Sequence, residues 1–230
     1  MTPPPTLLLA SGSPRRRELL RLLGLSFATT RADIDETPLP GESARAYTIR
    51  LSQDKARTAL AAAAGHTLVL AADTTVADGE AILGKPADAD EAWAMLRQLR
   101  GRAHQVYTAL TVIDVATGRA ITDIAVTGVP MRAYSDDEIA AYIASGDPFD
   151  KAGGYAIQHA GFHPAALTSG CYANVVGLPL CHLLRALRRL GVAARADVPE
   201  RCQAHFAYVC DVSEGILNTP LPLDSPFQPS

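Results

Sequence analysis

The sequence lacks long hydrophobic runs and any excess of positive charge. None of its apolar stretches approaches the length of a membrane span. Residues 1–5 lack the basic and long apolar regions of a signal peptide. The formal net charge is −3, whereas general nucleic-acid binders tend to be basic. We therefore expect a cytoplasmic protein that acts on a small ligand, with neither a nucleic acid nor a membrane as its partner.

Several motifs of known chemistry are also missing. There is no internal repeat, no low-complexity tract and no glycine-rich run ending in Gly-Lys-Ser/Thr, which excludes a Walker A loop. The spacings of the cysteines and of His182 and His205 match no standard zinc pattern, so a structural metal is not expected. The chain contains four cysteines, Cys171, Cys181, Cys202 and Cys210. These need not pair in a reducing compartment.

Length and composition allow a sizeable core. With 230 residues, 48% of them hydrophobic, the chain fits one large domain or two small lobes. Beyond about Ala196 proline becomes frequent and the helical period fades, although Phe206–Val209 suggests an edge strand. We predict a domain over residues 1–195 and a C-terminal extension of unknown structure over residues 196–230.

The segment Leu7–Leu20 reads as a strand, a turn with two serines, and a helix. Ser13 is a favoured N-cap residue and Pro14 suits the first helical position. Three arginines follow in the first turn, where the helix dipole disfavours a cation by roughly 0.3–1 kcal/mol each. Such a repeated violation suggests that an anion compensates it, and the free N–H groups of a helix start bind phosphate well. The alternative is a solvated arginine face.

The remaining pattern predicts an α/β fold. The run Thr67–Ala72 is continuously apolar, as in a strand covered on both faces, and it is predicted to end at Asp73. Ligands gather where such strands end in open α/β sheets. Other predicted elements are a strand over 27–33, helices over 43–64, 88–99, 136–144 and 179–190, a turn at Asp78-Gly79, and a hairpin of strands 105–115 and 121–134.

Several charged residues in this pattern also have ordinary interpretations. Lys55 can be a solvated helix lysine, Lys85 an ordinary turn residue, and Asp73 a backbone cap. Asp147 and Asp150 can be charges that solubilise a loop, and we favour that interpretation for Asp147.

Six short blocks of residues occur in order along the chain. They are Ser11-Gly12-Ser13-Pro14-Arg15-Arg16, Lys55-Ala56, Ala72-Asp73-Thr74, Gly84-Lys85-Pro86, Asp150-Lys151-Ala152-Gly153 and Asn174-Val175-Val176-Gly177-Leu178-Pro179-Leu180. Together they resemble the Maf family of nucleoside triphosphate pyrophosphatases, over roughly residues 6 to 191.

The resemblance implies a fold and an activity. The fold would be a mixed twisted α/β sheet with flanking helices in two lobes around a cleft, similar to the inosine-triphosphate pyrophosphatases. The activity would be hydrolysis of a nucleoside triphosphate to the monophosphate and pyrophosphate, in the service of nucleotide-pool house-cleaning. It would need a divalent cation, Mg²⁺ or Mn²⁺, and the protein would often be a homodimer.

Residue roles follow from the same resemblance. Splitting the α–β linkage builds negative charge on the leaving pyrophosphate, which cations must neutralise. The resemblance places cations from separate segments around one triphosphate, assigns proton acceptance to Asp73, and lets Glu36 share a metal with it. The implied catalytic residues are Asp73, Lys55 and Lys85; the substrate-binding residues are Ser11, Ser13, Arg15, Arg16, Thr74 and Gln158; the metal ligands are Glu36 and Asp73.

Substrate choice can also be carried over. Arg15, Thr74 and Gln158 match the branch of the family that prefers dTTP and UTP, rather than the branch with Trp, Gln and Glu that prefers 7-methyl-GTP. A glutamine amide can donate to a pyrimidine carbonyl and accept from N3–H. The alternatives are a 7-methyl-GTP or modified-nucleotide pyrophosphatase and a non-catalytic nucleotide-binding regulator of septum formation.

Overall fold

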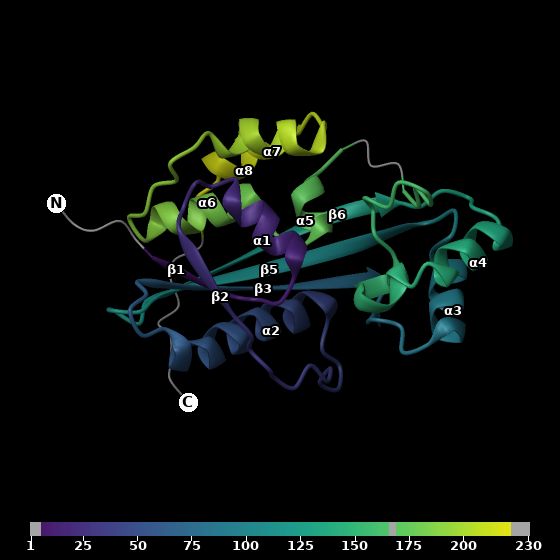
Figure 1. Ribbon diagram of the computed structural model, residues 1–230, viewed down its shortest axis with the longest axis horizontal. Coiled ribbons are helices and arrows are strands. Elements are labelled where there is room, and N and C mark those ends of the chain that lie inside the picture. The colour runs from purple at the N-terminus through teal and green to yellow at the C-terminus, as the bar shows by residue number, and fades with distance from the viewer. Residues whose placement is uncertain (1–5, 166–168, 222–230) are drawn as a thin grey trace.

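A computed structural model describes residues 6–165 and 169–221 and contains one mixed six-stranded sheet (Figure 1). The strand order is β2-β1-β3-β5-β6, and β4 also pairs with β3. β1 is parallel to β2 and β3, whereas β4, β5 and β6 join the sheet antiparallel. The strands are β1 (Leu7–Ala10), β2 (Phe27–Thr30), β3 (Leu68–Asp78), β4 (Ala81–Leu83), β5 (Ala103–Asp114) and β6 (Ala120–Pro130).

Helices cover both faces of the sheet. In Figure 1, α2 (Ala44–Ala59) lies on one face, α1, α5 and α6 lie on the other, and α3 and α4 lie at the far end of the long strands. The predicted α/β architecture is thus confirmed. The other bounds are α1 (Pro14–Arg21), α3 (Ala89–Leu99), α4 (Asp136–Ala144), α5 (Tyr172–Val176), α6 (Leu180–Arg189), α7 (Val198–Phe206), α8 (Ser213–Asn218) and the 3₁₀ turns Leu60–Ala62, Asp147–Asp150 and Ala152–Gly154.

The apolar runs of β1 and β3 are continuous because each strand is buried on both faces. Alternate side chains of a strand point to opposite faces. Leu7 and Leu9 join the cluster under α1 and α6, whereas Leu8 joins the cluster under α2. On β3 the same alternation sends Leu70 toward α6 and Val69 toward α2. A third cluster lies between the far end of the sheet and helices α3 and α4.

Local capping chemistry sets most helix starts. Ser13 caps α1 by accepting from the backbone N–H of Arg16, and Ser43 caps α2 in the same way. Ser135 and Glu138 form a complete capping box at α4. These starts agree with the predicted ones.

The structure corrects four predicted boundaries and one predicted element. β3 does not end at Asp73 but continues to Asp78, because β5 pairs with it along residues 68–77. β2 stops at Thr30, β6 stops at Pro130 instead of residue 134, and the helix predicted over 43–64 ends at Ala59 before a 3₁₀ turn. The edge strand over 206–209 is wrong: Phe206 ends α7, and Ala207 adopts a left-handed conformation with φ of 48°.

The described part of the C-terminal segment, residues 196–221, packs against the rest of the fold. α7 and α8 both contact α6, and Val198 is fully buried in the cluster beneath α1 and α6. In the described part of the chain, every helix is too short or too polar to serve as a membrane span.

Candidate active site

A cavity lies beside a gap along one edge of β3. β5 occupies one edge of β3. On the other edge β1 pairs with Leu68–Leu70 and β4 pairs with Val76–Asp78. Between these two partners, within the described residues, no strand pairs with residues 71–75 on that edge. A cavity of about 490 Å³ opens there, reached by side chains from both faces of β3.

The cavity collects nearly all of the predicted site residues. Ser11 is the exception: it is buried behind the wall, where its Oγ accepts from the backbone N–H of Ser13 at 3.2 Å. The predicted position of Asp73 at the end of its strand is wrong: Asp73 lies in the middle of β3, beyond the stretch that pairs with β1. The predicted residues on the wall are Ser13, Arg15, Arg16, Glu36, Lys55, Asp73, Thr74, Lys85 and Gln158.

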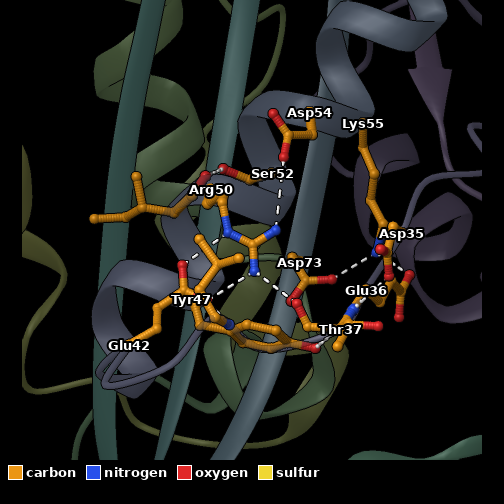
Figure 2. Close-up of polar contacts among 12 residues, drawn as sticks. Asp35, Glu36, Thr37, Glu42, Tyr47, Arg50, Ser52, Asp54, Lys55 and Asp73 are labelled. Carbon is orange, nitrogen blue, oxygen red and sulfur yellow. Dashed lines mark hydrogen bonds and ion pairs between the residues drawn. The ribbon is translucent and has the colours of Figure 1, made fainter.

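Lys55 joins two carboxylates at the centre of the site. Its Nζ lies 2.6 Å from Oδ1 of Asp73 and 2.7 Å from Oε1 of Glu36 (Figure 2). The side chains of Lys55 and Asp73 are only 12% and 8% exposed, so Lys55 is not a solvated helix lysine. Partial burial would raise the pKa of Glu36, but the hydrogen bond and charge of Lys55 outweigh it and hold that pKa below 4.5.

An irregular segment over residues 31–43 carries Glu36, and α2 fixes it. The hydroxyl of Tyr47 donates to the carbonyl of Glu36 at 2.7 Å, and Arg50 donates to both carboxylate oxygens of Glu42 at 2.7 Å (Figure 2). Burial raises the pKa of Tyr47 to about 12, so its hydroxyl stays protonated as a donor. Tyr47 was not among the predicted site residues, because nothing local in the sequence links it to a loop eleven residues earlier.

The cations of the cavity fall into two kinds. Arg16 donates from Nε to the carbonyl of Gly177 at 2.8 Å and from Nη2 to Oγ1 of Thr74 at 2.9 Å. Burial lowers the pKa of Arg16, an effect opposed by the charges of Asp73 and Glu36. By contrast, the described residues provide no ion pair or side-chain hydrogen bond to Arg15 or Lys85, although both line the cavity. Those two cations are available to an anionic ligand.

Another part of the cavity wall is held by Lys151, the lysine of the Asp150–Gly153 block. Its Nζ donates to the carbonyl and Oδ1 of Asp147, at 2.6 and 2.9 Å, and to Oδ1 of Asp150 at 2.5 Å. Asp147 also accepts from the hydroxyl of Tyr142 at 2.6 Å. The interpretation of Asp147 as a solubilising charge is therefore wrong: it ties this loop to α4. Lys151 lines the cavity but uses all three donors on its own loop.

The four cysteines are all free and line one small crevice between α6 and α7. Burial raises the pKa values of Cys181 and Cys202 to about 11 and about 12, so their thiols stay protonated. In residues 6–165 and 169–221, no group of three or more His, Cys, Asp or Glu side chains is arranged to hold a metal.

Comparison with known proteins identifies the family. The model described as "Maf-like protein" matches residues 6–190. The chain belongs to the Maf-like family. A protein of Myxococcus xanthus named dTTP/UTP pyrophosphatase is 50% identical over 186 residues, covering 81% of this chain and 93% of the relative. A protein of the same name from Geobacter sp. strain M21 is 46% identical over 187 residues, with 81% and 96% covered.

Solved structures resemble the Maf-like chain only in part. The Ham1 protein of Staphylococcus aureus has a TM-score of 0.39 and 13% identity, covering 56% of this chain and 72% of that one. Protein VC0702 from Vibrio cholerae has a TM-score of 0.36 and 7% identity, covering 56% and 60%. The α/β assignment therefore rests on the sheet itself.

The Maf-like blocks come from distant parts of the chain but converge on this cavity. The first, third and last blocks meet where Arg16 binds both Thr74 and the carbonyl of Gly177. Gly177 has φ of 117°, and a Cβ there would lie 3.2 Å from Oγ1 of Thr74. Glycine is required at this position by both its backbone conformation and this close approach.

Proposed function

We propose that this Maf-like chain hydrolyses dTTP and UTP to the nucleoside monophosphate and pyrophosphate. The observation that carries the proposal is the cavity: Arg15 and Lys85, free of ion pairs in the described structure, share it with the Lys55-linked carboxylates of Glu36 and Asp73. The relatives that bear the name dTTP/UTP pyrophosphatase support the substrate, because the match covers 93% and 96% of two of them.

The cations would bind the triphosphate. Arg15 and Lys85 enter the cavity from α1 and from the loop after β4. Ser13 stands at the start of α1, where free N–H groups favour an anion. Together they would neutralise the charge that grows on the leaving pyrophosphate, which is the main task in phosphoryl transfer.

Asp73 is our proposed proton acceptor. A water molecule would attack the α-phosphorus as its proton passes to the carboxylate of Asp73. The α-phosphorus would form a bond to the water oxygen, and its bond to the α–β bridging oxygen would break. That oxygen would leave with the electron pair as part of pyrophosphate. Lys55 would hold Oδ1 of Asp73, with which it makes a 2.6 Å contact, and so would orient the carboxylate.

The donor set of the site fits a divalent cation. The carboxylates of Glu36 and Asp73 both reach one Nζ atom, so they lie close together, and both line the cavity. Mg²⁺ and Mn²⁺ prefer oxygen ligands, and Mg²⁺ is usually held by one or two carboxylates together with substrate phosphates. We propose Glu36 and Asp73 as the protein ligands. When bound, the metal would neutralise phosphate charge and help orient the triphosphate.

The choice of nucleotide is assigned to Arg15, Thr74 and Gln158, of which Thr74 and Gln158 would contact the base. All three line the cavity, and Gln158 is exposed on the loop that leads away from Tyr155. An amide of this kind can donate to a pyrimidine carbonyl.

A nucleotide panel tests the proposal. The wild-type chain should convert UTP and dTTP to the monophosphate and pyrophosphate with Mg²⁺ or Mn²⁺ present. Asp73→Asn should lower kcat by about 10²–10⁴, the usual cost of losing a general base. Asp78→Asn, the same change further along β3 and outside the cavity lining, is the matched control. No product from any nucleotide would favour a non-catalytic regulator, and a higher kcat/KM for 7-methyl-GTP would favour the other branch.

We also propose the division of the chain, its assembly and its location. The catalytic domain would span residues 1–195, with residues 196–230 as an extension whose helices α7 and α8 pack against α6. A homodimer and a cytoplasmic location follow from the family resemblance. Light scattering of the purified chain tests the first of these, and cell fractionation tests the second.

A further inference from the structure

Two threonines lie opposite each other on neighbouring strands beside the cavity. Thr74 on β3 pairs with Thr108 on β5, and their Oγ1 atoms are 3.0 Å apart. Thr108 also donates from Oγ1 to the carbonyl of Asn174 at 2.9 Å. Thr108 and Asn174 are both completely buried, whereas Thr74 lines the cavity. A buried hydroxyl therefore stands directly behind a cavity hydroxyl.

The protons of this chain of contacts can be counted. A threonine hydroxyl has one proton to donate and two lone pairs to accept with. A carbonyl can only accept, so the single proton of Thr108 goes to Asn174. The contact between the two threonines must then be donated by Thr74. Because Arg16 donates to Oγ1 of Thr74 at 2.9 Å, that oxygen retains one lone pair and no proton.

The partners of Thr108 are themselves fixed. Asn174 donates from Nδ2 to the carbonyl of Val106 at 3.0 Å and to Oγ1 of Thr127 at 2.8 Å. All the atoms that set the direction of the Thr108 proton thus lie in buried backbone or buried side chains. Buried groups therefore fix the direction in which the Thr74 hydroxyl donates its proton, and no mobile group is involved.

We propose that Thr108 is a positioning residue that makes Thr74 an acceptor only, and that it thereby selects nucleotides whose base presents a ring N–H. Uracil and thymine present N3–H, whereas cytosine has a bare N3 that can only accept. Gln158 would donate its amide N–H to a pyrimidine carbonyl, and Thr74, with a free lone pair and no free proton, would accept from N3–H in place of the Gln158 amide oxygen. This inference rests on the proposed function and extends it to discrimination between UTP and CTP.

Thr108→Val tests the inference by removing the acceptor for the Thr74 proton while keeping the shape of the side chain. The Thr74 hydroxyl would then be free to donate, and the advantage of UTP over CTP should shrink. A hydrogen bond typically contributes about 0.5–1.5 kcal/mol, so the ratio of kcat/KM for UTP to that for CTP should fall roughly 2- to 10-fold. The loss should appear chiefly in KM for UTP.

Thr111→Val is the matched control. Thr111 lies on the same strand, is equally buried, and bonds to the hydroxyls of Ser52 and Thr122, none of which lines the cavity. In Thr111→Val, the ratio of kcat/KM for UTP to that for CTP should equal the wild-type ratio. Thr108→Ser, which restores a hydroxyl, should recover the wild-type ratio.

The outcomes separate this inference from the proposed function. If the wild type hydrolyses UTP but Thr108→Val keeps its UTP-to-CTP ratio, the inference is wrong and the proposed function stands. If the wild type hydrolyses no nucleotide, the proposed function fails first. Should Thr108→Val not fold, Thr108→Ala provides the same comparison. In a Thr74→Val background, replacing Thr108 should no longer change the ratio, and a further change there would contradict action through Thr74.

Discussion

Replacing Lys55 with methionine should destabilise the fold as well as impair activity. The Lys55–Asp73 pair is almost fully enclosed, with side chains 12% and 8% exposed. Removing one partner of a buried ion pair leaves an uncompensated charge and costs about 3–5 kcal/mol. The second pair, with Glu36, involves a side chain that is 48% exposed and so should add only about 0–1 kcal/mol. We expect a loss of roughly 3 kcal/mol in the free energy of unfolding at pH 7.

Lys85→Met provides the contrast. Lys85 is exposed and has no ion pair within the described residues, so its loss should leave the free energy of unfolding within ~0.5 kcal/mol of the wild type. Both variants should lose activity, by about 10²–10³ in kcat if each cation stabilises the transition state. The free energy of unfolding therefore distinguishes Lys55, which stabilises the site through its ion pairs, from Lys85, which would only bind the ligand.

The pH dependence of the Lys55 effect has a definite sign. Because the pKa of Glu36 is lowered in the folded state, its ionised form stabilises the fold above pH 4.5, and this contribution is lost as the pH falls through the lowered value. Lys55 is the main source of that lowering. The part of the wild-type advantage that comes from Glu36 should therefore decrease as the pH falls below 4.5.

Urea unfolding of the three proteins, followed by circular dichroism at pH 7 and at pH 3.5, measures these differences. A stabilising role of the Lys55–Asp73 pair would be contradicted if Lys55→Met unfolded at the same urea concentration as the wild type, or if Lys85→Met were destabilised as strongly as Lys55→Met.

Two further predictions concern groups outside the central ion pairs. Tyr47→Phe removes the hydrogen bond to the carbonyl of Glu36, so kcat/KM should fall roughly 2- to 10-fold in steady-state kinetics; an unchanged value would show that the segment over 31–43 holds itself in place. Burial lowers the pKa of His182 to about 4, so the unfolded chain takes up this proton first and stability falls as the pH drops from about 6.5 to 4. His182→Leu should make that fall shallower in urea titrations, and identical slopes would contradict the assignment.

The parts of the fold that could be predicted depend on local chemistry. Ser13, Ser43 and Ser135 correctly predict helix starts, because a serine hydroxyl caps free backbone N–H groups only a few residues away. The apolar run before Asp73 predicts a strand that is buried on both faces. Its end could not be predicted, because β3 continues only where the distant strand β5 pairs with it.

The remaining differences also arise from long-range partners. Asp147 seemed a solvated loop charge, since neither its bond to Lys151 nor the one from Tyr142 follows from spacing alone. The strand predicted over 206–209 failed because the segment instead ends a helix whose first residue, Val198, is buried against the main core. That the residues proposed for catalysis share one cavity could be predicted only from the family resemblance of their motif blocks. Their positions along the sequence do not by themselves predict that they lie close together.

The proposed function requires that water attack the α-phosphorus of a pyrimidine nucleoside triphosphate in the cavity beside Asp73. Hydrolysis of UTP in ¹⁸O-labelled water, with mass analysis of both products, tests it most directly. The expected products are UMP that carries one ¹⁸O atom and unlabelled pyrophosphate. Label in pyrophosphate, or release of UDP and inorganic phosphate, would contradict the proposed function.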